Sequence, residues 1–256
     1  MNLLEYLKQP ELKRIKNLDD PQTTVLHSQI IKEKVFLRNL YTDFYKIFKK
    51  SIDQNAKMMV ELGSGGGFIK EIIPDVITSD IIKVPNVDML FSAEQMPFES
   101  SSVDTFFMID VLHHIKGPRV FFSEAQRCLR KSGKIVMIEP ANTLWSRFIF
   151  KNFHHELFDT SAGWEMNKVG PLSDANGALA WIIFQRDRKL FESEFENLKI
   201  KSICFHTPFR YIVSGGLTYR QLLPSFMYSF VNFLEICLRP FNKWLGMFET
   251  IVLERQ

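Results

Sequence analysis

The sequence contains few cysteines, only a small excess of positive charge and no long apolar run. Cys128, Cys204 and Cys237 lie too far apart for a zinc motif and give no disulfide framework. A formal net charge of +3 lacks the basic excess of domains that bind phosphate backbones, so we expect no nucleic-acid partner. No stretch reaches the ~18 apolar residues of a spanning helix, and the charged N-terminus has no apolar core of the signal-peptide type. These absences predict a cytoplasmic protein.

The elements that are present alternate between strands and helices. An amphipathic helix is expected at 24–50, and further helices at 68–73, 118–130 and 178–197. Short apolar runs bounded by turn residues predict strands. The predicted strands are 57–62, 76–80, 87–91, 103–109, 134–139, 198–205 and 247–254. This alternation predicts an α/β fold with a doubly wound, mostly parallel seven-stranded sheet, an N-terminal helix and a helical insertion before the last strand.

The strongest local motif is a glycine cluster that follows the first predicted strand. It comprises Gly63, Ser64, Gly65, Gly66 and Gly67, preceded by Glu61. Glycines let a ligand approach the backbone closely, and a helix beginning just beyond them offers N–H donors. The dinucleotide spacing G-x-G-x-x-G fails because Phe68 takes the third glycine position, which disfavours a nicotinamide-dependent oxidoreductase. A carboxylate at Glu61 would repel a pyrophosphate and suits a cationic ligand.

A second acid stands 19 residues after Glu61, at Asp80, where the second predicted strand ends. An acid at this spacing can accept hydrogen bonds from the two hydroxyls of a ribose. The alternative is that Asp80 only caps the next element. Together, the glycine cluster and the two acids indicate a nucleotide-like cofactor that carries a positive charge.

Four segments in this order resemble the motifs of class I S-adenosylmethionine-dependent methyltransferases: VELGSGGG, ITSDII, SAEQMPFESSSVDTFFMIDVLHHI and RCLRKSGKIVMIEP. The subgroup they resemble most includes the ubiquinone and menaquinone C-methyltransferases, and the resemblance covers about 57–140. It implies that S-adenosylmethionine is the cofactor and that its binding residues include Glu61, Gly63, Ser64, Gly65, Asp80, Ile81, Ala93 and Asp110.

The same resemblance leaves the catalytic residues unassigned. A base is needed only when the methyl acceptor must lose a proton. The candidates are His113 and His114 after the fourth predicted strand, and His154 and His155 in the HHE cluster. Histidines at 113 and 114 also match a position where the family has histidine with differing substrates, which favours a structural or cofactor-adjacent role. We expect no metal site.

The acceptor side is predicted from what the shared motifs leave over. The chain is interpreted as one methyltransferase domain over 1–256, with a helical cap at 1–56, a cofactor-binding core at 57–140 and an acceptor-side half at 141–256. The insertion at 209–245 mixes aromatic and basic residues, so a lid, a dimer contact and a peripheral membrane contact all remain open. The expected activity is methyl transfer to a small-molecule or lipid-like acceptor. The alternative is an S-adenosylmethionine-binding partner or regulatory protein without transfer.

Overall fold

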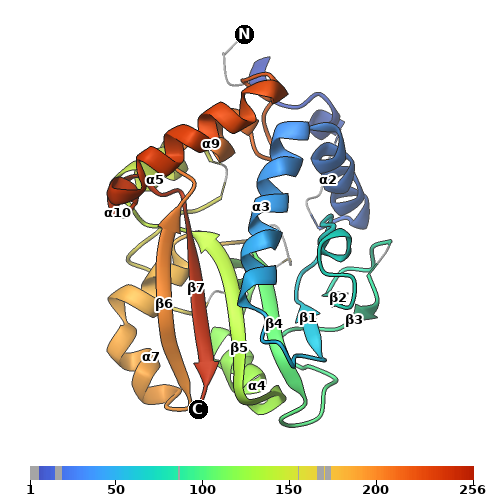
Figure 1. Cartoon of the computed structure of the whole chain (residues 1–256), viewed down its shortest axis with the longest axis vertical. Helices are drawn as coiled ribbons and strands as arrows, with labels where there is room; N and C mark the ends of the chain where they lie inside the picture. Colours follow the sequence, from blue (N-terminus) through green and yellow to red (C-terminus); the bar gives the residue numbers. More distant parts are fainter. Residues whose placement is uncertain (1–5, 15–18, 86, 155, 166–169, 171–173) are drawn as a thin grey trace.

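A seven-stranded sheet forms the centre of the computed structural model, in the order β3-β2-β1-β4-β5-β7-β6 (Figure 1). The model describes residues 6–14, 19–85, 87–154, 156–165, 170 and 174–256. β7 runs antiparallel to both of its neighbours, whereas the pairs among β1 to β5 are parallel. The strands are β1 (Met59–Glu61), β2 (Ile77–Asp80), β3 (Met89–Leu90), β4 (Val103–Ile109), β5 (Leu129–Pro140), β6 (Leu198–His206) and β7 (Phe248–Arg255). All seven predicted strands are confirmed, although β5 begins five residues before its predicted start.

Helices cover both faces of this sheet. α3 packs on one face, where the Phe48 ring stacks on Phe107 with centroids 4.8 Å apart. On the other face, Phe122 of α4 packs against Phe191 of α7 at 5.1 Å. Each such ring pair adds about 0.5–1.5 kcal/mol beyond the apolar area that it buries. The helices are α2 (Pro21–Glu33), α3 (Val35–Ser51), α4 (Pro118–Cys128), α5 (Leu144–Phe153), α6 (Leu179–Trp181), α7 (Arg188–Glu194), α8 (Arg210–Ser214), α9 (Tyr228–Cys237) and α10 (Asn242–Leu245).

Two helices that the sequence predicts as continuous are interrupted. The helix expected at 24–50 is α2 followed by α3, with a break at Lys34, whose backbone leaves the helical region. The buried Lys34 ammonium donates to the carbonyl oxygens of Gly216 and Tyr219, the latter at 2.7 Å, so the break attaches α2 to the later insertion. The helix expected at 178–197 becomes α6, a π turn over Ile182–Arg186, and α7. The apolar periodicity of the two segments did not predict either break, because the first depends on a tertiary contact of Lys34 and the second on a π turn.

The parallel strands place their carboxyl ends at one edge of the sheet. Glu61, Asp80, Ile109 and Pro140 end β1, β2, β4 and β5, and the chain leaves each of them towards that edge. In Figure 1 this is the upper edge, where α2, the start of α3 and α9 are also found. Ligands of open α/β sheets bind outside the carboxyl ends of the strands. None of the helices in the described part of the chain combines the length and the apolar character that crossing a membrane requires.

Candidate active site

The glycine loop after β1 depends on two left-handed backbone positions. Gly63 has φ 64° and Gly65 has φ 48°, values that residues with a side chain rarely adopt. The Ser64 amide donates to the Ser79 carbonyl at 2.8 Å, which ties the loop to β2. A Cβ on Gly65 would lie no closer than 3.7 Å to an atom outside the loop, an ordinary van der Waals distance, and this position lines the cavity. The predicted role of Gly65, to leave room for a ligand, therefore has a geometric basis.

The other two glycines of the loop serve packing. A Cβ on Gly66 would lie 2.6 Å from the Ser28 amide nitrogen of α2, and one on Gly67 would collide with the Tyr45 hydroxyl of α3. At both positions the added Cβ would lie closer to its neighbour than real Cβ atoms do. The loop is therefore pressed against the two N-terminal helices, and these glycines are needed whether or not a ligand is bound.

Asp80 holds the loop through its carboxylate. Its Oδ2 accepts from the Gly65 amide at 2.8 Å, and its Oδ1 accepts from the Ile82 amide at 2.8 Å. Asp80 therefore does cap the segment that follows β2, which is the alternative function given by the sequence. This capping does not exclude ribose binding, because the carboxylate lines the cavity and each oxygen has further lone-pair capacity. Ile81 also lines the cavity and is 57% exposed, so its side chain is available to pack on a planar ring.

Glu61 is a buried carboxylate with an unsatisfied oxygen. Its side chain is 3% exposed, and Oε2 has no hydrogen-bond partner among the residues that the structure describes. Burial raises the pKa of Glu61 to about 8, with the charge of Asp80 acting in the same direction and the Ser64 and Tyr45 side chains opposing it. Such a group is costly unless a cation or an N–H donor reaches it. The orphaned oxygen at the cavity wall therefore fits a cofactor that carries a positive charge.

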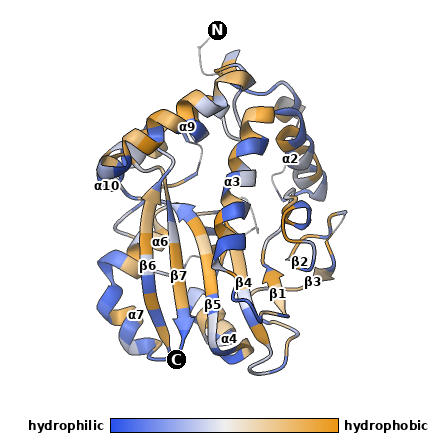
Figure 2. Cartoon of the chain, in the orientation of Figure 1, coloured by the Kyte–Doolittle hydropathy of each residue, from blue (hydrophilic) through white to orange (hydrophobic). Residues whose placement is uncertain are grey.

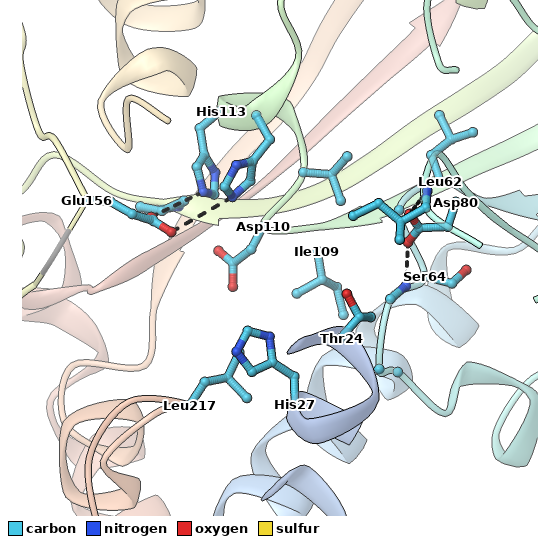
Figure 3. A pocket seen from close by; sticks show the side chains of 18 of the residues that line it. Thr24, His27, Leu62, Ser64, Asp80, Ile109, Asp110, His113, Glu156 and Leu217 are labelled. Atoms are coloured by element: carbon cyan, nitrogen blue, oxygen red, sulfur yellow. Dashed lines mark hydrogen bonds and ion pairs between the residues drawn. The ribbon is translucent and has the colours of Figure 1, made fainter. Parts of the chain in front are cut away.

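Asp110 lies midway along the cavity. Figure 3 shows its carboxylate between Ser64 and Asp80 on one side and His113 and Glu156 on the other. Its backbone is left-handed, with φ 56°. Burial raises the pKa of Asp110 to about 8, although the His113 charge opposes this shift.

A buried histidine–carboxylate pair lies at the far end of the cavity, where its histidine, His113, lines the wall. Glu139, at the end of β5, is fully buried and accepts from the Val111 amide at 2.9 Å and the Leu112 amide at 2.7 Å. Its other oxygen lies 2.7 Å from His113 Nδ1. Although burial opposes protonation, Glu139 and Glu156 raise the pKa of His113 to about 10. His113 therefore carries a positive charge at neutral pH and its orientation is fixed. Glu139 was not among the predicted site residues, although an acid inside the apolar run KIVMIEP indicates a functional or paired group.

Glu156 brings three of the four candidate histidines together. Its carboxylate oxygens lie 3.6 Å from His113 Nε2, 3.9 Å from His114 Nε2 and 3.8 Å from His154 Nδ1. The fourth candidate, His155, lies outside the described residues. Ligand atoms of His113, His114 and Glu156 lie within 4.8 Å of one another, which is close enough for one divalent ion. The histidine–carboxylate contacts also pair opposite charges without an ion, and the absence of a metal stays a prediction.

One cavity of about 1010 Å³ connects these groups. At one end it is lined by the glycine loop, Glu61, Asp80, Ile81 and Ala93, and at the other by His113, His114, His154 and Glu156. All eight predicted cofactor-binding residues therefore line this one cavity. Several other residues that line the cavity were not predicted as site residues. They are Lys8, Leu12, Thr24, His27, Ile31, Tyr41, Tyr45, Phe150, Phe158, Tyr211, Leu217 and Phe248. Figure 3 shows His27 and Leu217 facing Asp110 from the opposite wall.

Comparisons with known proteins agree with this geometry. Residues 60–137 match the family described as a methyltransferase domain. No curated protein matches the chain by sequence. A solved methyltransferase of Thermotoga maritima, described as S-adenosylmethionine-dependent and as a possible histamine N-methyltransferase, is similar with a TM-score of 0.54 and 15% identity, over 90% of this chain and 99% of that one.

A second solved structure, an S-adenosylmethionine-dependent methyltransferase of Archaeoglobus fulgidus, is similar with a TM-score of 0.51 and 13% identity, over 85% of this chain and 94% of that one. At these identities the likeness concerns the fold. The fold is that of the S-adenosylmethionine-dependent methyltransferases. Residues 60–137 match a methyltransferase domain, and the cofactor that this match and the fold imply is S-adenosylmethionine.

Proposed function

We propose that this protein transfers a methyl group from S-adenosylmethionine to a small-molecule or lipid-like acceptor. The observation that carries the proposal is the single cavity, which runs from the glycine loop past Asp110 to the histidine–glutamate cluster. A protein that only held the cofactor would have no need of this additional volume. The non-catalytic alternative is therefore the weaker one.

The residues at the loop end of the cavity would hold the cofactor. Gly65 leaves the close approach open, Asp80 offers acceptors for ribose hydroxyls, and Glu61 offers its unsatisfied oxygen to a positively charged or N–H group. When bound, S-adenosylmethionine supplies a methyl group already activated by a positively charged sulfur, so the protein mainly binds, orients and excludes water.

The opposite end would receive the acceptor. Phe150, Phe158, Tyr211, Leu217 and Phe248 give it apolar and aromatic walls. These walls suit an acceptor with a hydrophobic body, which lies within the class predicted from the sequence. The resemblance of the four motifs to ubiquinone and menaquinone C-methyltransferases supports the same acceptor class.

His113 at this end carries a positive charge. Because the pKa of His113 is raised to about 10, His113 already holds its proton at neutral pH and is a poor proton acceptor. We assign it instead to pairing with Glu156 and to favouring negative charge on a nearby acceptor atom. Asp110, with a pKa of about 8, is the better matched group for accepting a proton from the acceptor.

A transfer assay tests this proposal. The protein is incubated with methyl-labelled S-adenosylmethionine and a total extract of lipids and metabolites, and labelled products are identified by mass. We expect label in an apolar product with the wild type and none with Gly65→Val. Gly163→Val is the matched control, because a Cβ on Gly163 meets no atom within 4 Å. Cofactor binding without labelled product would favour the non-catalytic alternative.

A further inference from the structure

The insertion at 209–245 does two different things. Its first part, around Tyr211 and Leu217, lines the cavity. Its second part turns apolar side chains to solvent, with Phe226 84% exposed, Phe230 55% and Phe233 60%. Figure 2 shows hydrophobic residues along α9, which lies at the end of the molecule opposite α4 and α7. The first part of the insertion therefore borders the cavity, whereas the second part presents a separate exposed surface.

The one acid of this segment points inward. Glu235 is 4% exposed and accepts from the Phe209 and Arg210 amides at 2.8 and 2.7 Å. Its second oxygen pairs with the Arg210 side chain, which also contacts Asp43 of α3 at 2.7 Å. Arg210 is therefore buried and removed from the set of basic residues considered for a membrane contact. The same pairing anchors α9, so that its remaining faces are free to be apolar.

α5 and α10 extend the exposed apolar surface beyond α9. α10 packs against α5, and α5 exposes Leu144 at 68% and Phe148 at 52%. We use the term apolar platform for the exposed residues of these helices and the turns beside them. Its members are Leu144, Arg147, Phe148, Lys151, Phe153, Phe226, Phe230, Phe233, Leu234, Ile236, Arg239, Phe241, Lys243 and Trp244.

The charges on the apolar platform have one sign. No acid occurs between residues 141 and 155, and Glu235 is the only one between 207 and 247. The platform cations are Arg147, Lys151, Arg239 and Lys243, all exposed. The Lys243 ammonium lies 4.0 Å from the centre of the Trp244 ring, so its stem follows the aromatic surface. Two copies that met through this surface would bring like charges together, which disfavours a self-interface.

We propose that the apolar platform docks on the surface of an anionic lipid bilayer. Exposed phenylalanine and tryptophan side chains can enter the boundary between headgroups and acyl chains, while lysine and arginine remain at the headgroups. Each basic residue near an anionic surface contributes about 1 kcal/mol, which is about a fivefold change in binding. Exposed apolar side chains gathered on neighbouring helices are typical of an interaction site.

The platform adjoins the cavity wall. The Tyr219 hydroxyl donates to the Phe153 carbonyl at 3.0 Å, which joins the end of α5 to the insertion. The neighbouring Leu217, Thr218 and Leu157 line the cavity. Docking would thus place an acceptor-side wall near the bilayer. This consequence rests on the proposed function, because it assumes that the cavity receives a lipid-like acceptor.

Vesicle sedimentation of the full-length protein tests the docking. The probes are phosphatidylcholine vesicles with and without phosphatidylglycerol, at low and high salt. We expect sedimentation with the anionic vesicles at low salt, and at least tenfold weaker binding at high salt or without phosphatidylglycerol. Phe230→Ser/Phe233→Ser should weaken binding at least tenfold, and Arg239→Gln/Lys243→Gln about twenty-fivefold with a smaller salt dependence.

The control variant is Val120→Ser/Leu190→Ser, which removes exposed apolar side chains from α4 and α7 and should bind as the wild type does. Absence of wild-type sedimentation at low salt would overturn the proposal, as would equal losses in the control. Dimerisation abolished by Phe230→Ser/Phe233→Ser, without vesicle binding, would show a self-interface instead. Gly65→Val should still bind vesicles, so failure of the methyltransferase proposal can be told apart from failure of docking.

Discussion

The two ends of the cavity are built in different ways. The cofactor end comes from one continuous stretch, in which the glycine loop, Asp80 and Ala93 follow successive strands. The acceptor end is assembled from segments that are far apart in sequence, such as α2, His154 with Glu156, and the start of the insertion. Backbone conformation dominates at the first end and side-chain charge at the second. Variants at the two ends should therefore separate cofactor binding from stability and acceptor chemistry.

The largest effect is expected for Gly65→Val at the cofactor end. A β-branched side chain is disfavoured at φ 48° and would fill the space bordering the loop. We expect at least a thousandfold loss of S-adenosylmethionine affinity, about 4 kcal/mol, measured by calorimetric titration. Gly163→Val should leave the affinity unchanged. Unaltered binding by a folded Gly65→Val protein would remove the cofactor assignment.

Glu139→Gln tests the acceptor end. Removing one partner of a buried ion pair costs about 3–5 kcal/mol, so we expect a loss of about 3 kcal/mol in the free energy of unfolding. The pKa of His113 should fall from about 10 towards its ordinary value of 6.5, as followed by imidazole NMR shifts.

The sign of the pH dependence follows from the same pair. Because the folded pKa of His113 lies above its unfolded value, the stabilisation is complete below pH 6.5 and declines as the pH rises towards 10. The exposed Glu99 provides the control, since Glu99→Gln should change stability by no more than about 0.5 kcal/mol. An unchanged His113 pKa in Glu139→Gln would show that the pair does not set the charge at this end.

Asp80→Ala should weaken the cofactor at least tenfold, about 1.4 kcal/mol. The carboxylate contributes both acceptors for the ribose and the tether on the Gly65 amide. Asp80→Asn retains one carbonyl oxygen and should recover part of the affinity if the tether dominates. A loss below threefold in Asp80→Ala, by calorimetry, would leave Asp80 as a cap alone.

The smallest effect concerns Glu61 and pH. Without ligand its pKa is about 8, so binding of a cationic cofactor must release a proton below that pH. We expect affinity for S-adenosylmethionine to fall about fivefold between pH 8 and pH 7, with proton release detected in buffers of different ionisation enthalpy. Demethylated cofactor, which lacks the sulfonium charge, should show a smaller dependence. Equal slopes for the two ligands would exclude Glu61 as the partner of the sulfonium.

The residues proposed to hold the cofactor could be named from the sequence because their determinants are local. The strand, the glycines and the acids at Glu61 and Asp80 are readable as spacing along the chain. The mostly parallel seven-stranded sheet follows from the same alternation, and it is confirmed.

The acceptor end was less readable because its contacts are long-range. Glu139 and His113 are 26 residues apart and meet only through the pairing of β4 with β5. The break at Lys34 depends on carbonyl oxygens 182 and 185 residues away, which no local pattern encodes. Arg210 is a basic residue of the insertion, and its enclosure by Glu235 and Asp43 depends on contacts that no local pattern indicates.

The most direct test of the central claim is a crystal structure of the protein with S-adenosylmethionine. If one cavity serves both partners, the adenosine part lies by Asp80 and Ile81, and the transferable methyl group points along the cavity towards Asp110 and His113. A methyl group directed into the protein wall, or a cofactor bound outside this cavity, would contradict the account.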